Sequence, residues 1–166
     1  MIRSKTILPI RYTVANYFSF SMAEGFESET WLTQTMSRKH WLDKSSFVVL
    51  IVDDDPFFVE AITLQFASLG IHNVLSARNG EEALDLLHLR SGDVDLIVCD
   101  VFMPETDGFY VLDHVKDTGF SGSLLFISGA DAEVFPVLNL MGAANQVKIA
   151  GTLKKPVSMQ QLSAAI

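Results

Sequence analysis

The segment VVLIVDDDP, residues 48–56, holds an apolar run followed directly by three aspartates, Asp53, Asp54 and Asp55. Neighbouring carboxylates repel one another, and an apolar core does not require them. An acid at a strand end is often a helix cap or part of a solvated turn, and Asp55 before Pro56 fits a cap. A chemical role for the other two aspartates therefore needs further groups close to them.

Three later residues offer complementary chemistry: Asp100 after DLIVC, Ser128 at the end of SLLFIS, and Lys155 in GTLKKP. Taken singly, each has a plain structural explanation. Clustered carboxylates stay ionised when a cation joins them, and Mg²⁺ or Mn²⁺ prefers such oxygen ligands. A hydroxyl and an ammonium would then assist an anionic group on the metal. The set is typical of phosphoryl transfer, in which an aspartate can be the nucleophile.

The elements predicted around these residues alternate regularly from residue 47 onward. Strands are predicted at 47–52, 72–77, 94–99, 123–128 and 149–154. Helices are predicted from Pro56 to Gly70, at 81–90, 108–116 and 131–145, and from the Ser158 cap to the chain end. Strict alternation predicts an α/β fold, a doubly wound parallel sheet with right-handed crossovers.

A five-stranded sheet of this kind fits the flavodoxin-like strand order 2-1-3-4-5. Its functional edge lies at the carboxyl ends of the strands, beside the switch point between the first and third. Asp54, Asp100, Ser128 and Lys155 all stand at such ends, so we expect them to share one edge.

Composition limits the class of protein. The 166 residues carry a net charge of −8, which disfavours nonspecific binding to nucleic acid or to an anionic membrane. Residues 1–44 hold six Lys and Arg against four Asp and Glu, whereas residues 45–166 hold six against sixteen. The one cysteine, Cys99, excludes an intrachain disulfide and is predicted to be buried. With no apolar stretch long enough to span a membrane and no clear signal peptide, we expect a cytoplasmic protein.

The change in charge also suggests two parts. Residues 1–44 are predicted to be an N-terminal extension, flexible or partly helical. Residues 45–166 are predicted to be one domain, with the last helix cut off at Ile166.

The segment from about Ser46 to Ile166 resembles the receiver domain of two-component response regulators. The matching motifs are VVLIVDDDP, DLIVCDVFMPETDG, LLFISG and GTLKKPVS, in the order and spacing of that family. The resemblance implies a phosphorylation-dependent signalling switch rather than an enzyme with a separate substrate. Its partner would be a sensor histidine kinase or a phosphotransfer protein, and Asp100 would accept the phosphoryl group.

The resemblance also implies roles for the other site residues. Asp54 would bind Mg²⁺ directly, Asp53 would act mainly through water, and the backbone carbonyl of Phe102 would complete the protein's ligands. Ser128 would be the switch hydroxyl, which hydrogen-bonds the acyl phosphate. Lys155 would pair with the phosphoryl group.

Two further positions belong to the same family pattern. The bond between Lys155 and Pro156 is expected to be cis. The position where the family has a switch aromatic is occupied by Thr152, so a rotating ring cannot report phosphorylation there.

Two alternatives stay open at this point. A degenerate receiver would keep the fold and act as a phosphorylation-independent binding module. A haloacid-dehalogenase-like phosphatase also uses clustered aspartates, a hydroxyl and a lysine with Mg²⁺. However, Phe57 stands where that family has Thr or Val, no acidic pair follows Lys155, and Asp100 would have no role.

The output cannot be read from these residues. The region between Ser128 and Lys155 and the pattern GTLKKPVSMQQL are similar to receivers attached to cyclic-di-GMP phosphodiesterase domains of the EAL type. An output domain C-terminal to this chain and a homodimer are both compatible with the sequence, and no direct contact with nucleic acid or membrane is expected.

Overall fold

The computed structural model describes residues 44–90, 92–129 and 132–166. The predicted extension, residues 1–44, lies outside them apart from Lys44. The strands are β1 (Val48–Val52), β2 (Asn73–Ala77), β3 (Leu96–Asp100), β4 (Ser123–Ser128) and β5 (Lys148–Lys154). The α-helices are α2 (Pro56–Ser68), α3 (Gly80–Arg90), α4 (Gly108–His114), α5 (Phe135–Ala144) and α6 (Met159–Ala164). The structure also has two short 3-10 helices, η2 (Val115–Thr118) and η3 (Ala132–Val134).

The five strands form one parallel sheet in the order β2-β1-β3-β4-β5, which confirms the predicted fold. Because the neighbouring strands all run in the same direction, their carboxyl ends lie along one edge. The register pairs Val52 of β1 with Cys99 of β3, and Ser128 of β4 with Lys154 of β5. The residues that follow these positions are therefore neighbours in space.

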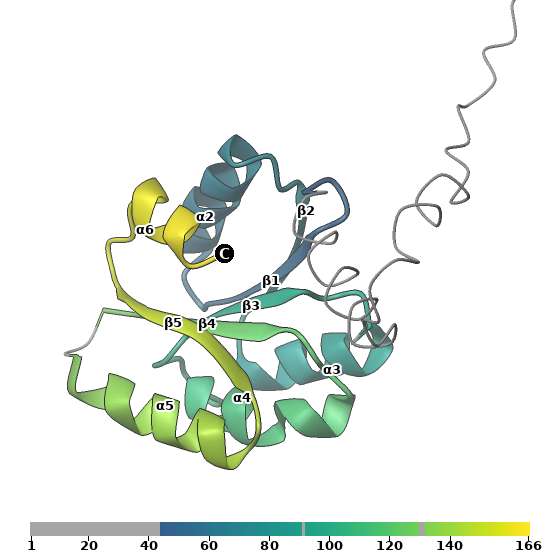
Figure 1. Cartoon of the computed structure of the whole chain (residues 1–166), viewed down its shortest axis with the longest axis vertical. Coiled ribbons are helices and arrows are strands. Elements are labelled where there is room, and N and C mark those ends of the chain that lie inside the picture. The colour runs from purple at the N-terminus through teal and green to yellow at the C-terminus, as the bar shows by residue number, and fades with distance from the viewer. Residues whose placement is uncertain (1–43, 91, 130–131) are drawn as a thin grey trace, which may run out of the picture. The chain divides into compact units, whose positions relative to one another are not determined.

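Helices cover both faces of the sheet (Figure 1). α2 and α6 lie on one face, and α3, α4 and α5 lie on the other. Successive residues of β1 point to opposite faces, so Val49 and Ile51 join one apolar cluster while Leu50 and Val52 join the other. A strand buried on both sides explains the unbroken apolar run in the sequence.

Several element boundaries differ from the predicted ones. β3 begins at Leu96 rather than at residue 94, and the carboxylate of the preceding Asp95 accepts a hydrogen bond from the Val48 N–H at 2.8 Å. The predicted helix 108–116 is interrupted after His114, and η2 continues it to Gly119, whose φ is 80°. α5 begins only at Phe135, with a proline in its first turn.

Local predictions near the site hold well. Asp55 caps α2, because its carboxylate accepts a hydrogen bond from the Phe57 N–H at 2.9 Å. Gly70 ends that helix with a φ of 84°. Cys99 is buried, and burial raises the pKa of its thiol well above the ordinary value.

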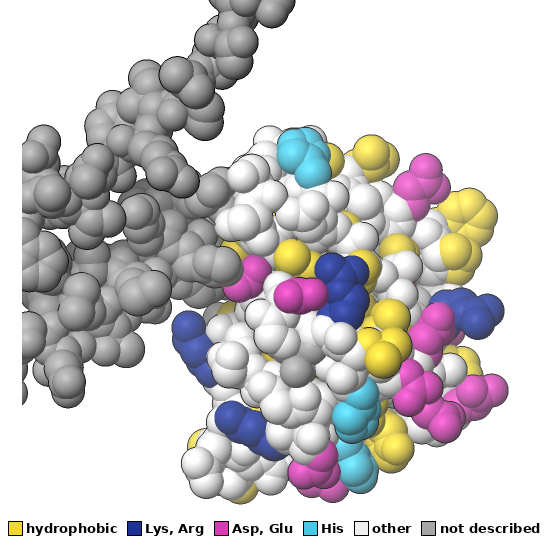
Figure 2. All heavy atoms as spheres, turned by 90° about the vertical axis from the view of Figure 1, so that its right-hand side faces the viewer, with side chains coloured by type: hydrophobic (Ala, Val, Ile, Leu, Met, Phe, Trp, Pro, Cys, Tyr) yellow, Lys and Arg dark blue, Asp and Glu magenta, His cyan; other side chains and the backbone are white. Residues whose placement is uncertain are grey.

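Basic side chains are scattered on one face of the described surface. On the face in Figure 2, the Lys and Arg side chains of the described residues lie apart and form no continuous basic patch. Among the described residues, no helix is both long enough and apolar enough to cross a membrane.

Candidate functional site

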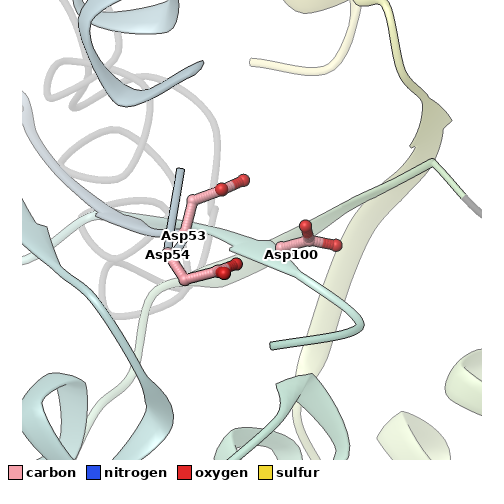
Figure 3. Close-up of side chains that lie close together, drawn as sticks. All are labelled: Asp53, Asp54 and Asp100. Atoms are coloured by element: carbon pink, nitrogen blue, oxygen red, sulfur yellow. The ribbon is translucent and has the colours of Figure 1, made fainter. Parts of the chain in front are cut away.

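Three aspartates meet at the carboxyl edge of the sheet. Asp53 and Asp54 follow β1, and Asp100 is the last residue of β3. One oxygen atom from each carboxylate lies within 4.8 Å of the other two. Figure 3 shows the side chains of Asp53 and Asp54 extending from the end of β1 toward the side on which Asp100 lies. The adjacent parallel strands produce this cluster, as the sequence predicted.

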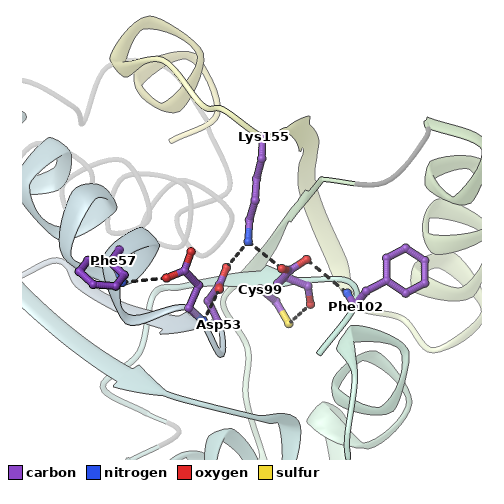
Figure 4. Close-up of polar contacts among 7 residues, drawn as sticks. Asp53, Phe57, Cys99, Phe102 and Lys155 are labelled. Atoms are coloured by element: carbon purple, nitrogen blue, oxygen red, sulfur yellow. Dashed lines mark hydrogen bonds and ion pairs between the residues drawn. The ribbon is translucent and has the colours of Figure 1, made fainter. Parts of the chain in front are cut away.

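Lys155 enters the site from the other side of the sheet edge (Figure 4). It follows β5, and its N–H donates a hydrogen bond to the carbonyl oxygen of Ser128 at 2.8 Å. Its Nζ donates to Asp53 Oδ2 at 2.6 Å and to Asp100 Oδ2 at 2.7 Å. The ammonium therefore joins two carboxylates that come from two different strands.

The remaining oxygens of these carboxylates accept backbone hydrogen bonds. Asp53 Oδ1 accepts from the N–H of Asp55 at 2.9 Å, and Asp100 Oδ1 accepts from the N–H of Phe102 at 3.2 Å. Each side chain is thus fixed at both oxygens, and the site is organised before any ligand binds.

The electrostatics reflect burial and close pairing. Burial raises the pKa of Asp53, although hydrogen bonds from Lys155 and from the Asp55 N–H act in the opposite direction. Burial alone would lower the pKa of Lys155, but hydrogen bonds to Asp100 and Asp53 outweigh it and raise that pKa above its ordinary value. Lys155 therefore stays protonated, and the charge on Asp53 is only partly compensated.

The three aspartates differ in their access to solvent. The Asp53 side chain is 1% exposed, the Asp100 side chain is 10% exposed, and Asp54 is exposed. Asp53 and Asp100 are both paired with Lys155, whereas among the described residues no cation pairs with Asp54. Asp100 alone of the three combines a contact with the ammonium and a route to solvent.

The residues fit a divalent cation of the Mg²⁺ type. Three carboxylates against one ammonium leave two negative charges in excess, and such a cation would balance them. The donors are hard oxygen atoms, which Mg²⁺ prefers, and the exposed Asp54 leaves room for water ligands. The chemistry of the donor set therefore agrees with the predicted cofactor.

The other predicted site residues lie around this centre. Ser128 is fully buried at the end of β4, one residue beyond Ile127, which pairs with Asp100. The Phe102 side chain is 49% exposed, and a metal-binding role for its carbonyl stays a prediction. Thr152 is half-buried on the edge strand β5 and pairs with Phe126. The Lys155–Pro156 bond is cis, as the resemblance implies.

Two contacts of the site are not predicted by the sequence pattern. The ring centroid of Phe58 lies 4.0 Å from Lys155 Nζ. A Cβ added at Gly108 would lie only 2.6 Å from the carbonyl oxygen of Asp100, so α4 can start there only without a side chain. Gly108 belongs to the motif DLIVCDVFMPETDG, which the sequence already indicates. No spacing rule predicts that the Phe58 ring lies beside the lysine.

Comparison with known proteins identifies the family of this chain. The family model described as the response regulator receiver domain matches residues 49–166 of the chain. The chain belongs to the response regulator receiver family. The chain therefore carries a receiver domain of the kind found in two-component systems, which confirms the resemblance and excludes the phosphatase family.

Individual relatives agree with this assignment. The receiver is 32% identical over 126 residues to the sensor kinase CckA of Brucella abortus, covering 75% of this chain and 12% of the kinase. It is 35% identical over 94 residues to the Regulator of RpoS of Escherichia coli, covering 55% of this chain and 27% of that protein. The chain thus spans only a small part of these relatives.

A solved structure extends the likeness to the fold. CheY in the CheX-CheY-BeF3-Mg complex from Borrelia burgdorferi superposes with a TM-score of 0.63 at 26% identity. The match covers 72% of this chain and 85% of that one. The five-stranded receiver fold is therefore shared along nearly the whole of the matched domain.

Proposed function

We propose that this receiver is a phosphorylation-dependent switch whose acceptor is Asp100. A carboxylate oxygen of Asp100 attacks the phosphorus atom of a phosphohistidine on a sensor kinase or phosphotransfer protein. The new bond joins the Asp100 oxygen to phosphorus, and the phosphorus–nitrogen bond breaks. The electron pair of that bond goes to the imidazole, and Asp100 becomes an acyl phosphate.

The observation that carries this proposal is the difference among the three aspartates. Asp53 is closed off from solvent, and among the described residues Asp54 forms no ion pair with the ammonium. Asp100 is partly open, with Lys155 Nζ 2.7 Å from its Oδ2. A nucleophile needs access to its substrate and a positive charge close to the group that arrives, and Asp100 has both.

The chain's own groups assist the transfer in distinct ways. Lys155 offsets negative charge on the incoming phosphoryl oxygens, and the N–H of Phe102 keeps one Asp100 oxygen oriented. We propose that Asp54 directly, Asp53 through water and the carbonyl of Phe102 hold Mg²⁺ or Mn²⁺. When bound, that cation supplies the positive charge that lets clustered carboxylates and a phosphoryl group coexist.

Phosphorylation would act as a switch through Ser128. The acyl phosphate carries about two negative charges where the carboxylate carried one, so phosphorylation adds about one negative charge to an already acidic edge. Movement of the Ser128 hydroxyl toward it would alter β4 and the surface formed by α5 and β5. Because Thr152 carries no ring, either another residue transmits this change or the coupling to the output surface is weaker.

The cellular location and the output of the switch are part of the same proposal. We propose a cytoplasmic receiver that passes its signal to an output domain C-terminal to residue 166 or to a separate protein. A cyclic-di-GMP phosphodiesterase of the EAL type is one such output. Homodimerisation stays a prediction. The division into an N-terminal extension, residues 1–44, and one domain, residues 45–166, is also a prediction.

Labelling by acetyl phosphate, a small phosphoryl donor, tests the acceptor without a known kinase. Intact-mass spectrometry would follow wild type, Asp100→Asn and Asp85→Asn, each with Mg²⁺ and with EDTA. Asp85 lies exposed on α3 and serves as the matched control. We expect one phosphoryl group on wild type and Asp85→Asn in Mg²⁺, and none on Asp100→Asn.

Two results would contradict the proposal. Full labelling of Asp100→Asn would show that another residue is the acceptor. No labelling of wild type with acetyl phosphate or with a panel of phosphorylated phosphotransfer proteins would support the degenerate receiver, which keeps the fold and acts by binding alone.

A further inference from the structure

Lys155 is enclosed on one side by carboxylates and on another by an aromatic ring. Its Nζ contacts Asp53 and Asp100, and the ring centroid of Phe58 lies 4.0 Å from the same nitrogen. The metal ligands and the acceptor do not require this ring. Its position directly beside the ammonium therefore calls for its own explanation.

The ring can limit where the ammonium goes. A lysine stem is long and flexible, and its charged end tends to move into water. The face of an aromatic ring attracts a cation, and the attraction grows when the cation has lost part of its water. The Lys155 side chain is only 21% exposed, and its Nζ contacts the two carboxylates and the ring.

The chain places this ring firmly. Phe58 lies in the first turn of α2, where the carboxylate of Asp55 caps the helix and Pro56 begins it. Its ring is partly buried and packs against the apolar cluster on that face of the sheet. Phe57, in contrast, is 80% exposed. Of the two adjacent phenylalanines, only Phe58 faces the site.

We propose that Phe58 is a positioning residue that holds the Lys155 ammonium beside Asp100. This inference rests on the proposed function, because its purpose is phosphoryl transfer to Asp100. The ring keeps Nζ out of the solvent and next to the oxygen that attacks. The positive charge is then in place when the phosphoryl oxygens arrive, and no search by the flexible stem is needed.

The position of Phe58 in the chain adds a physical link. Six consecutive residues, 53–58, hold two acids of the site, the cap of α2 and the ring over the lysine. Through this ring α2 contacts the side chain that bridges β1 and β3. The conformation of the first turn of α2 is therefore coupled to the lysine.

The rate of labelling of the full chain by acetyl phosphate in Mg²⁺ tests the proposal. Phe58→Leu keeps apolar packing but removes the ring, and we expect it to slow labelling about two- to tenfold. Phe58→Tyr keeps the ring face and should label at close to the wild-type rate. Phe57→Leu is the matched control on the exposed side of the same turn and should label as wild type does.

A second background separates positioning from packing. In Lys155→Met, the ring has no ammonium to hold, so Phe58→Leu should add no further slowing. If Phe58→Leu slows labelling equally with and without Lys155, the ring acts through packing and the proposal is wrong. An unchanged rate in Phe58→Leu, with Lys155 intact, would also overturn it.

A direct measurement keeps this inference distinct from the proposed function. In NMR spectra, the ring current of Phe58 should shift the side-chain Hε signals of Lys155 upfield, and Phe58→Leu should remove that shift. Absence of the shift in wild type would overturn the positioning claim even if Asp100 is labelled. Presence of the shift without labelling of wild type would overturn the proposed function and the role of Phe58 in transfer, while the contact itself would stand.

Discussion

The acid half of the site, Asp53, Asp54 and Asp100, is held differently from the lysine half, Lys155. The acids stand at the ends of β1 and β3, two central strands that are almost entirely buried. Lys155 follows β5, an edge strand that is only partly buried along its length. Its position depends on a flexible side chain and on the groups that contact its ammonium.

The positions of the two halves are therefore fixed by different parts of the structure. The acid half is placed by backbone and strand register, so its geometry survives as long as the sheet does. The lysine half is placed by side-chain interactions that can loosen by degrees. We therefore expect changes to the acid half to remove activity, and changes to the lysine half to reduce it.

After the loss of the acceptor Asp100 itself, the largest expected effect comes from removing the exposed acid, Asp54. Asp54→Ala should lower the rate of Mg²⁺-dependent labelling by at least about 100-fold, because a ligand of the required cation is lost. Asp55→Ser is the matched control, since serine can still cap α2 while the neighbouring charge disappears. Rates measured by intact-mass spectrometry should separate the two variants. Equal labelling of Asp54→Ala and Asp55→Ser would remove Asp54 from the metal site.

Removing the lysine should have a smaller, graded effect. Lys155→Met deletes two charge-assisted hydrogen bonds but leaves the acids on their strands. Labelling should slow between about 10- and 100-fold without disappearing, the scale of one hydrogen bond to a charged group. Time courses with acetyl phosphate would check this. Complete loss of labelling, equal to that of Asp100→Asn, would show that the two halves are not distinct in this way.

Backbone placement of the acid half can be tested at Gly108. In Gly108→Ala, the new Cβ would lie 2.6 Å from the Asp100 carbonyl oxygen and 3.0 Å from Val101 Cα. The added methyl should lower the free energy of unfolding by about 1–3 kcal/mol, measured by urea denaturation. Gly92→Ala has no atom within 4 Å of its new Cβ and should change stability by less than about 0.5 kcal/mol. Equal stability of the two variants would contradict the close packing behind Asp100.

The smallest expected effect is at Thr152. Thr152→Val removes a hydroxyl from a half-buried position on β5, and within the described part of the chain no hydrogen bond joins that side chain to the acids. The labelling rate should therefore change by less than about twofold, since changes away from such contacts have small effects. A large loss of rate in Thr152→Val would show that β5 contributes more to the site than Lys155 alone.

The two halves also differ in how well the sequence predicts them. The uninterrupted apolar run before Asp53 and the alternation of elements gave the sheet, its strand order and the edge that the acids share. These features follow from period and burial, which a single sequence carries. Exact element ends are harder to predict, because backbone hydrogen bonds to distant residues decide them; Asp95, just before β3, bonds both Val48 and Ser123.

The contact of Phe58 with Lys155 lies beyond any such pattern. Phe57 and Phe58 are adjacent and identical in type, yet one is exposed and the other faces the ammonium. Which of them points inward depends on the angle at which α2 leaves β1. That angle is a property of the assembled fold. The sequence therefore predicts that Lys155 belongs to the site, but it does not predict the ring that contacts its ammonium.

The residue that carries the phosphoryl group is the most direct test of the account. Wild-type protein would be labelled with acetyl phosphate in Mg²⁺, treated with borohydride to reduce the acyl phosphate to a stable alcohol, and mapped by peptide mass spectrometry. We expect reduction at Asp100 alone, with no such product in EDTA. Reduction at Asp53 or Asp54, or a phosphoryl group on any other side chain, would contradict it.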